Sequence, residues 1–252
     1  MERRRIAGLD VRRFPDRPAL GAAAAADIAA FMRARLARQP RLRMIFAAAP
    51  SQGEMLAALI AEPGIDWPRV VAFHMDEYHT LPAGAPQRFG NWLRRALFAH
   101  VSIGEIRLIE AEADPSAAMA DYARHLAMAP IDAVCLGIGV NGHLAFNDPP
   151  VADLADPLDV KLVELDETCR RQQVDDGAFT RLDDVPRVAV TLTVPRLLRA
   201  DRLFCVVPGP AKREAVRRSL HDPIGAACPG TALRLHGDCT LYVDRDSHPE
   251  PL

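Results

Sequence analysis

The sequence predicts an α/β fold, with a mainly parallel, Rossmann-like sheet and helices on both of its faces. Three observations support this prediction. Short apolar runs with the character of buried strands recur along the chain. Segments with helical periodicity separate most of these runs, and such alternation is typical of parallel sheets. The chain has 252 residues, of which 49% are hydrophobic and 25% charged, so it can bury the core that this fold needs.

Each predicted element follows from its local pattern. The predicted strands are short apolar runs between polar, glycine or proline residues, at 42–48, 70–73, 106–109, 131–136, 188–192, 203–207 and 241–243. The predicted helices repeat apolar residues every three or four positions, at 19–36, 53–60, 88–98, 116–127 and 211–220. Residues 149–186 are rich in Asp and Pro with weak periodicity, so we expect an excursion that can act as a flap over a site.

Composition excludes several classes of protein. The net charge of -2 gives no general attraction to nucleic acid or to an anionic membrane, so we expect neither as a partner. The alanine-rich run 19–26 is too short to span a membrane. The five cysteines are widely spaced without a C-x-x-C pair, which predicts no disulfide framework or zinc knuckle and favours a cytoplasmic location. No repeat or linker divides the chain, so we expect one domain over residues 1–252.

The segment 136–150 combines a strand end, glycines and a histidine. The glycines allow backbone turns that are closed to other residues. His143 would lie at the carboxyl edge of the sheet, where open α/β sheets bind ligands. Asp148 can fold back to accept a proton from the His143 ring and set its tautomer. His143 is then either a positioned acid or base, or a histidine that only caps the turn.

The same segment matches the G-x-G-x-x-G pattern of dinucleotide-binding folds. That pattern requires a helix to begin at the third glycine, so that its amino terminus faces the pyrophosphate. Here the sequence Asn-Asp-Pro-Pro at 147–150 ends any helix within about one turn. We therefore do not expect a dinucleotide.

Asp76 and Glu77 follow another apolar run, at 70–73. Adjacent side chains on an extended segment point in opposite directions, so only one carboxylate should face a given pocket. A partly desolvated carboxylate there would be a competent general base, whereas a solvated acidic turn is the structural alternative. His74 and His79 lie nearby, but their spacing is not that of a helical H-E-x-x-H site, so we expect no metal.

Two further turns between a strand and a helix could hold phosphate. Ser51, Gln52 and Gly53 precede a predicted helix whose free N–H groups favour an anion, although an ordinary capping box explains the pattern equally well. Lys212 and Arg213 lie in a first helical turn, where the helix dipole disfavours positive charge unless an anion binds. Solvated side chains are the alternative, more so for Arg213 than for Lys212.

Three features together resemble the glucosamine-6-phosphate deaminase/isomerase family, whose fold group includes sugar-phosphate lactonases. They are Met-Asp-Glu-Tyr at 75–78, Gly-x-Gly-x-x-Gly-His-x-Ala-Phe-Asn at 137–147, and the lysine at 212. The resemblance extends with gaps from about residue 41 to residue 244 and implies a phosphosugar isomerase/deaminase-like fold. It implies hydrolytic conversion of an amino-sugar 6-phosphate, such as glucosamine 6-phosphate, into a ketose 6-phosphate and ammonia. It also implies a phosphosugar as the partner, with no metal and no organic cofactor.

The resemblance also assigns roles to individual residues. His143 would open the pyranose ring with Asp148 as its acidic partner, while Asp76 would move a proton from C2 to C1 through an enolamine. The remaining assignments are Glu77 and Asn141 as support for these groups, and Ser51, Gln52, Gly53, Gly139 and Lys212 as substrate- or phosphate-binding residues.

Some positions depart from the family pattern. The family's Thr-Gly-Gly-Thr-Pro phosphate loop is Ala-Ala-Pro-Ser-Gln-Gly here, at 48–53. Asn141 stands where relatives have Asp, and Asp148 where Glu is usual. No residue matches the family's phosphate-binding arginine in the flap, although Arg170 and Arg171 lie near that position.

Two alternatives to the deaminase stay open. The same fold could act on another substrate, by galactosamine 6-phosphate turnover, another phosphosugar isomerisation or lactone hydrolysis. A non-catalytic sugar-phosphate sensor would normally carry a DNA-binding segment, and residues 1–41 lack an obvious helix-turn-helix pair. The resemblance leaves assembly into a homo-oligomer open.

Overall fold

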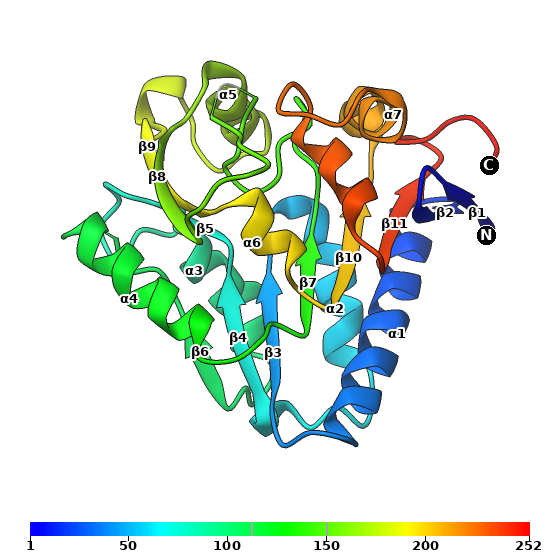
Figure 1. Cartoon of the computed structure of the whole chain (residues 1–252), viewed down its shortest axis with the longest axis horizontal. Coiled ribbons are helices and arrows are strands. Elements are labelled where there is room, and N and C mark those ends of the chain that lie inside the picture. The colour runs from blue at the N-terminus through cyan, green and yellow to red at the C-terminus, as the bar shows by residue number, and fades with distance from the viewer. Residues whose placement is uncertain (112, 150) are drawn as a thin grey trace.

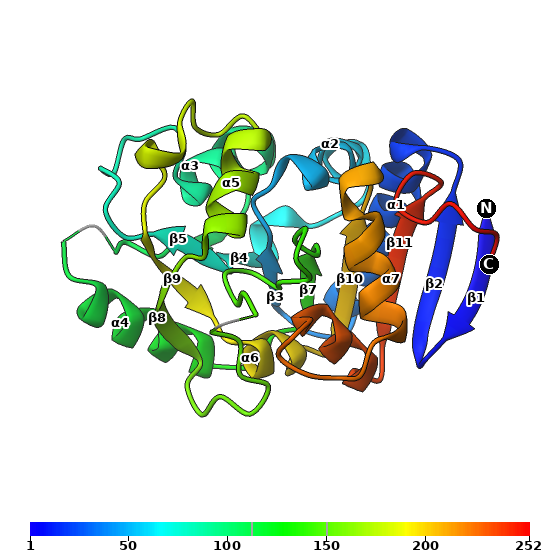
Figure 2. The ribbon, with the colours of Figure 1, turned by 90° about the horizontal axis from the view of Figure 1, so that it is seen from above.

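A computed structural model describes residues 1–111, 113–149 and 151–252, and it shows a sheet between two layers of helices (Figures 1 and 2). Within these residues eight strands form one sheet, in the order β1-β2-β11-β10-β7-β3-β4-β6. The β1–β2 pair is antiparallel and the other neighbouring pairs are parallel. The predicted α/β fold with a mainly parallel sheet is confirmed.

The bounds of the elements are as follows. The main sheet contains β1 (Glu2–Ile6), β2 (Leu9–Phe14), β3 (Leu42–Phe46), β4 (Val70–His74), β6 (Glu105–Arg107), β7 (Ala133–Leu136), β10 (Arg202–Val207) and β11 (Cys239–Asp244). A second, antiparallel sheet has the order β5-β9-β8, with β5 (Asp76–Tyr78), β8 (Val160–Glu164) and β9 (Val188–Leu192). The α-helices are α1 (Arg17–Leu36), α2 (Gly53–Ala61), α3 (Phe89–Leu93), α4 (Pro115–Ala127), α5 (Glu167–Asp175), α6 (Val194–Leu198) and α7 (Arg213–His221).

Helices cover both faces of the main sheet. Helices α1, α2 and α3 pack in one hydrophobic cluster, and α4, α6 and α7 pack in another. On β3, Met44 and Phe46 belong to the first cluster and Ile45 to the second, because alternate side chains of a strand face opposite sides. A strand such as β3, which is buried along its whole length, therefore suits a sheet that is covered on both sides. In the described part of the chain, no helix is both long and apolar enough to cross a membrane.

The amino-terminal hairpin was not predicted. Strand β2 pairs in parallel with β11, and its Leu9 and Val11 are fully buried. Ala7 and Gly8 form the turn, and both have the positive φ that tight hairpin turns need. Strand β1 was not predicted because it contains no apolar run: it is an edge strand with three exposed arginines in a row.

The second sheet also departs from expectation. The predicted strand 188–192 forms as β9, but it pairs antiparallel with β5 and β8 and not with the main sheet. The predicted excursion over 149–186 contains β8 and α5, which lies at the end of the molecule where β3 and β7 have their carboxyl ends (Figure 1). Helix α5 escaped prediction because its buried face is mostly polar. The side chain of Asp166 caps it by accepting the N–H of Cys169 at 2.8 Å.

Candidate active site

Asp76 and Glu77 lie where the chain passes from the main sheet into the second sheet. The Asp76 side chain lines a cavity, whereas Glu77 is fully buried outside the cavity wall. The Glu77 carboxylate accepts the N–H groups of Phe89 and Gly90, each at 3.0 Å, at the amino end of α3. It also accepts the N–H of Tyr78 at 3.0 Å. Glu77 therefore holds α3 in place, while Asp76 is the carboxylate available to a ligand.

Asp76 is in an unusual electrostatic environment, with only 7% of its surface exposed. Burial raises the pKa of Asp76 well above its ordinary value, and the nearby carboxylates of Glu77 and Asp148 raise it further. Burial and like charges both disfavour the ionised form, which makes the ionised carboxylate a stronger base than one in water. Such a group suits proton abstraction from carbon.

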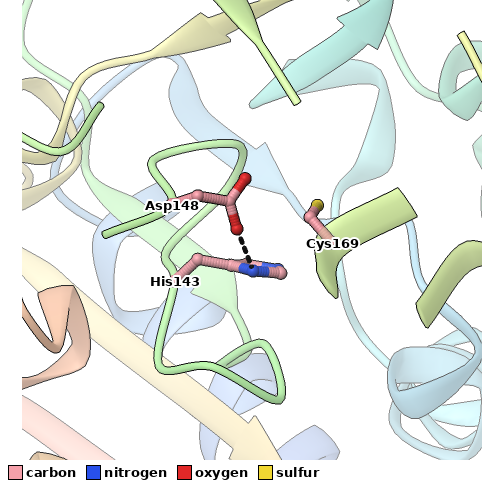
Figure 3. A group of neighbouring side chains, drawn as sticks. All are labelled: His143, Asp148 and Cys169. Carbon is pink, nitrogen blue, oxygen red and sulfur yellow. Dashed lines mark ion pairs between the residues drawn. The ribbon is translucent and has the colours of Figure 1, made fainter. Parts of the chain in front are cut away.

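His143 lies in the turn after β7, with its ring beside Asp148 (Figure 3). Its Nδ1 atom is 2.8 Å from Oδ1 of Asp148, so this aspartate reaches the ring although it is one methylene shorter than a glutamate. Asn141 supports both residues, since its Nδ2 donates to Asp148 Oδ1 at 2.8 Å and its Oδ1 accepts the His143 backbone N–H at 3.0 Å. Nε2 is then the ring nitrogen left for a ligand.

The pKa of Asp148 moves in the opposite direction from that of Asp76. Burial acts to raise it, but the ring of His143, the amide of Asn141 and the thiol of Cys169 together hold the pKa of Asp148 below its ordinary value. Asp148 is therefore ionised at neutral pH and can orient the His143 ring. Two carboxylates of one site with pKa values shifted apart are typical of acid–base catalysis.

Glycine at position 139 makes room for the His143 ring. A Cβ at this position would lie 2.1 Å from the ring atoms Cε1 and Nε2, which no real contact allows. The Gly139 N–H donates to the His143 carbonyl at 2.9 Å, so the turn holds the histidine by its backbone as well. Gly142 has a φ of +92°, which favours glycine. The glycines that resemble a dinucleotide pattern thus shape the histidine turn.

Asp76 and His143 meet in one cavity of about 400 Å³, a size that suits a small ligand. The sequence-predicted residues in its wall are Ser51, Gln52, Asp76, Gly139, His143 and Lys212. The others, Gly53, Glu77, Asn141 and Asp148, are outside the wall, and the last two contact His143.

One end of the cavity is formed by the turns before α2 and α7. The Gln52 side chain is fully buried, and its Nε2 donates to the Val206 carbonyl at 3.1 Å and to Ser51 Oγ at 3.2 Å. Lys212 is half-buried, and among the described residues no ion pair or hydrogen bond holds its ammonium group. Burial lowers the pKa of Lys212, although the nearby Asp176 and Cys169 act to raise it. An anion bound at this end of the cavity would stabilise the charged form of Lys212, which burial disfavours.

The two arginines of α5 do not reach the cavity. Arg170 is buried and donates to the carbonyls of Leu182 and Val185 at 2.6 and 3.0 Å. Arg171 is exposed and donates to Glu167 at 2.6 Å. Both arginines therefore support α5 and neither is in the cavity wall.

Sequence reasoning missed cavity residues from two helical segments. The wall also contains Gln172, Gln173 and Asp176 from the α5 region, and Phe89, Trp92 and Arg95 from α3 and the π-helix Arg94–Phe98 that continues it. The spacing of three residues between Phe89, Trp92 and Arg95 is a signal that places them on one helix face. The α5 residues carry no comparable signal, because their neighbours are almost all polar.

Among the described residues, His143, Asp148 and Cys169 form the one group of three donors that could hold a metal ion, with ligand atoms within 4.8 Å of one another (Figure 3). An ion would have to displace the direct contact between His143 and Asp148. His74 and His79 belong to no such group. Burial lowers the pKa of His74 to about 3, so it stays neutral, and its Nε2 accepts the Ile109 N–H at 3.3 Å.

Comparisons with known proteins show which family the chain belongs to. The family model described as glucosamine-6-phosphate isomerases/6-phosphogluconolactonase matches residues 15–241. A glucosamine-6-phosphate deaminase of Halothermothrix orenii is 31% identical over 196 residues, which cover 76% of this chain and 79% of that protein. One of Listeria monocytogenes serotype 4a is 30% identical over 198 residues, covering 78% and 82%.

Solved structures show the same fold. The structure of a monomeric glucosamine-6-phosphate deaminase has a TM-score of 0.86 at 24% identity and covers 95% of this chain and 98% of that one. A 6-phosphogluconolactonase from Thermotoga maritima has a TM-score of 0.76 at 18% identity, covering 93% and 98%.

Proposed function

Because the chain belongs to the family of glucosamine-6-phosphate isomerases and 6-phosphogluconolactonases, we propose that it is an amino-sugar phosphate deaminase. It converts glucosamine 6-phosphate and water into fructose 6-phosphate and ammonia. The observation that carries this proposal is the convergence of Asp76 and His143 on one cavity that also contains Lys212. A base for carbon acids, an acid–base group for ring opening and a cation for phosphate are the three functions that this reaction requires.

The first step is ring opening. His143 takes the proton of the C1 hydroxyl and returns a proton to the ring oxygen, so that the C1–O5 bond breaks and an aldehyde forms. Asp148 holds the imidazole by Nδ1, which leaves Nε2 for both transfers. Gly139 and Asn141 keep the ring in this position. A histidine suits the step because imidazole exchanges protons near neutral pH.

The second step is isomerisation. Asp76 removes the proton from C2, and the electron pair forms the C1–C2 double bond of an enolamine. The aldehyde oxygen takes up a proton that the ammonium group on C2 gives up, so that the nitrogen becomes the neutral amine of the enolamine. Asp76 then returns the proton to C1, which leaves C2 doubly bonded to nitrogen. Water adds to C2 and ammonia leaves, giving the ketose. The ammonium group of the substrate favours the ionised form of Asp76, which burial otherwise disfavours.

Two alternatives have less support. A sugar-phosphate sensor usually carries a DNA-binding segment, and residues 1–41 contain β1, β2 and the long helix α1, which are not a helix-turn-helix pair. A lactonase has the same fold, and the altered turn at Pro50–Gln52 is the observation that keeps another phosphosugar substrate open. We place the reaction in the cytoplasm, since the five cysteines are free and buried, as a reducing compartment favours.

The test is turnover on a panel of glucosamine 6-phosphate, galactosamine 6-phosphate and 6-phosphogluconolactone, with ammonia and fructose 6-phosphate measured separately. We expect ammonia and fructose 6-phosphate in equal amounts from the first substrate. Asp76→Asn should lower the rate by about 10²–10⁴-fold, the usual contribution of a general base. Asp183→Asn, which changes an exposed carboxylate outside the cavity, is the matched control. Hydrolysis of the lactone alone, or full ammonia release by Asp76→Asn, would refute the assignment.

A further inference from the structure

The substrate phosphate needs more positive charge than Lys212 supplies. A phosphate monoester carries about two negative charges near pH 7. Proteins bind such groups most effectively with guanidinium groups, which can donate two parallel hydrogen bonds. Among the residues of the cavity wall, Arg95 alone has a guanidinium group, and Lys212 alone has an ammonium group.

The neighbouring arginines are engaged elsewhere. Arg170 and Arg171 are committed to the carbonyls and the carboxylate described above. Arg17 lies near the turn before α2, but it pairs with Glu54 at 3.0 Å. Arg213 donates to the carbonyl of Asp246 at 3.2 Å, and neither Arg17 nor Arg213 is in the cavity wall.

Arg95 faces the cavity because of its place in the helix. Phe89, Trp92 and Arg95 lie three residues apart and all three line the cavity, so one face of this helical segment forms part of the wall. The π-helix that contains Arg95 packs against α2, whose preceding turn contributes Pro50 and Ser51 to the same cavity. Short π-helical turns are often found at functional sites.

The guanidinium group is both fixed and available. One NH2 group of Arg95 donates to the carbonyl of Pro86, also in the cavity wall, at 2.7 Å. A guanidinium has five N–H donors, so this bond orients the group and leaves the other donors for a ligand. The side chain is exposed, so it can adjust to a ligand without disturbing the core.

We propose that Arg95 is a phosphate-binding residue, which holds the 6-phosphate of the substrate together with Lys212. The two cations come from different elements, Arg95 from the π-helix after α3 and Lys212 from the turn before α7. Together they neutralise the two charges of the phosphate. The inference rests on the proposed function, because it identifies the group that this function needs at the phosphate end.

The experiment compares Arg95→Met, Arg95→Lys and Arg94→Met with the wild type. Arg94 is the matched control, because it is the adjacent exposed arginine and is not in the cavity wall. Thermal unfolding checks that each variant folds. For each protein, calorimetry measures the affinities for glucosamine 6-phosphate and for inorganic phosphate, and a coupled assay measures kcat and KM.

We expect Arg95→Met to weaken both affinities and to raise KM by about 10–100-fold, as is usual for the loss of a hydrogen bond to a charged group. The kcat should stay within about threefold, because the phosphate contact is equal in the ground and transition states. Arg95→Lys should recover part of the loss, and Arg94→Met should change each value by less than about twofold.

The outcomes separate this inference from the proposed function. If the wild type binds glucosamine 6-phosphate without releasing ammonia, the deaminase is wrong, and the calorimetric affinities still decide the role of Arg95. If the wild type turns over the substrate and Arg95→Met binds phosphate as tightly as Arg94→Met does, the deaminase stands and the role of Arg95 is overturned. If the wild type binds neither ligand, both are overturned.

Discussion

Replacing Gly139 with alanine tests the geometry of the histidine turn more directly than replacing the histidine itself. The added Cβ would lie 2.1 Å from Cε1 and Nε2 of His143. Carbon atoms in contact prefer a separation of about 3.5–4.0 Å, so the ring has to withdraw by more than about 1 Å. This movement takes Nε2 away from the ligand and strains the 2.8 Å contact between Nδ1 and Asp148.

The expected size of the effect follows from that displacement. A misplacement of about 1 Å at a reacting group can cost about 100-fold in rate, or about 2.7 kcal/mol in the activation barrier. Overpacking costs about 1–3 kcal/mol of stability, which corresponds to a fall of roughly 2–4 °C in Tm per kcal/mol for a domain of this size. Gly139→Ala should therefore stay folded while kcat falls by about 100-fold or more.

The assay is the initial rate of ammonia release from glucosamine 6-phosphate at saturation, with thermal unfolding measured on the same samples. Gly237→Ala is the control, because its Cβ would meet nothing within 4 Å and its φ is not positive. It should keep the rate of the wild type. A folded Gly139→Ala variant with a rate within about threefold of the wild type would show that catalysis does not need the ring where the structure places it.

Three further outcomes follow from the carboxylates. Folding raises the pKa of Asp76, so its ionised form destabilises the folded protein at pH 7, and Asp76→Asn should raise the Tm measured in thermal unfolding at that pH. The gain in Tm should vanish below about pH 3.9, where the carboxyl is protonated in both states. An unchanged or lower Tm at pH 7 would contradict the burial argument. On acidification, kcat/KM should fall as the pH passes through the raised pKa of Asp76, and not near pH 4. The acidic fall in kcat should occur at a lower pH than the acidic fall in kcat/KM, and coincident falls in the two pH profiles would contradict this. Glu77→Leu leaves three backbone N–H groups without an acceptor, so it should lower the free energy of unfolding by about 3 kcal/mol or more in urea titrations, and a loss below about 1 kcal/mol would show that Glu77 does not hold α3.

Asp76 and His143, the proposed catalytic pair, could be found from the sequence because their signals are local. Asp76 and His143 each follow an apolar strand, and the carboxyl ends of parallel strands meet at one edge of a sheet. The alternation of side chains along an extended segment also predicts, from the sequence alone, that Asp76 and Glu77 point in opposite directions. What Glu77 binds could not be predicted, because its partners Phe89 and Gly90 come close only when α3 packs on β5.

The elements that the sequence did not predict owe their structure to tertiary contacts. Strand β1 has no apolar face of its own and forms because β2 offers it a partner. Helix α5 buries Cys169, Arg170 and Gln173, a face that no hydrophobic pattern reveals. Tyr78 donates to Gln173 at 2.9 Å and Arg170 donates to two carbonyls, so hydrogen bonds replace apolar contacts there.

The two aspartates of the site differ in what stabilises their ionised forms. Asp148 accepts a hydrogen bond from Asn141 and interacts with the ring of His143 and the thiol of Cys169, so the protein itself keeps this carboxylate ionised. Asp76 has no side-chain hydrogen bond among the described residues, and burial raises its pKa. Its ionised form is therefore stabilised when a cationic ligand arrives. The amino group of an amino sugar provides that charge next to the carbon that loses its proton, whereas a neutral sugar phosphate does not. The same burial that makes Asp76 costly to the fold thus favours an amino sugar over its hydroxyl analogue.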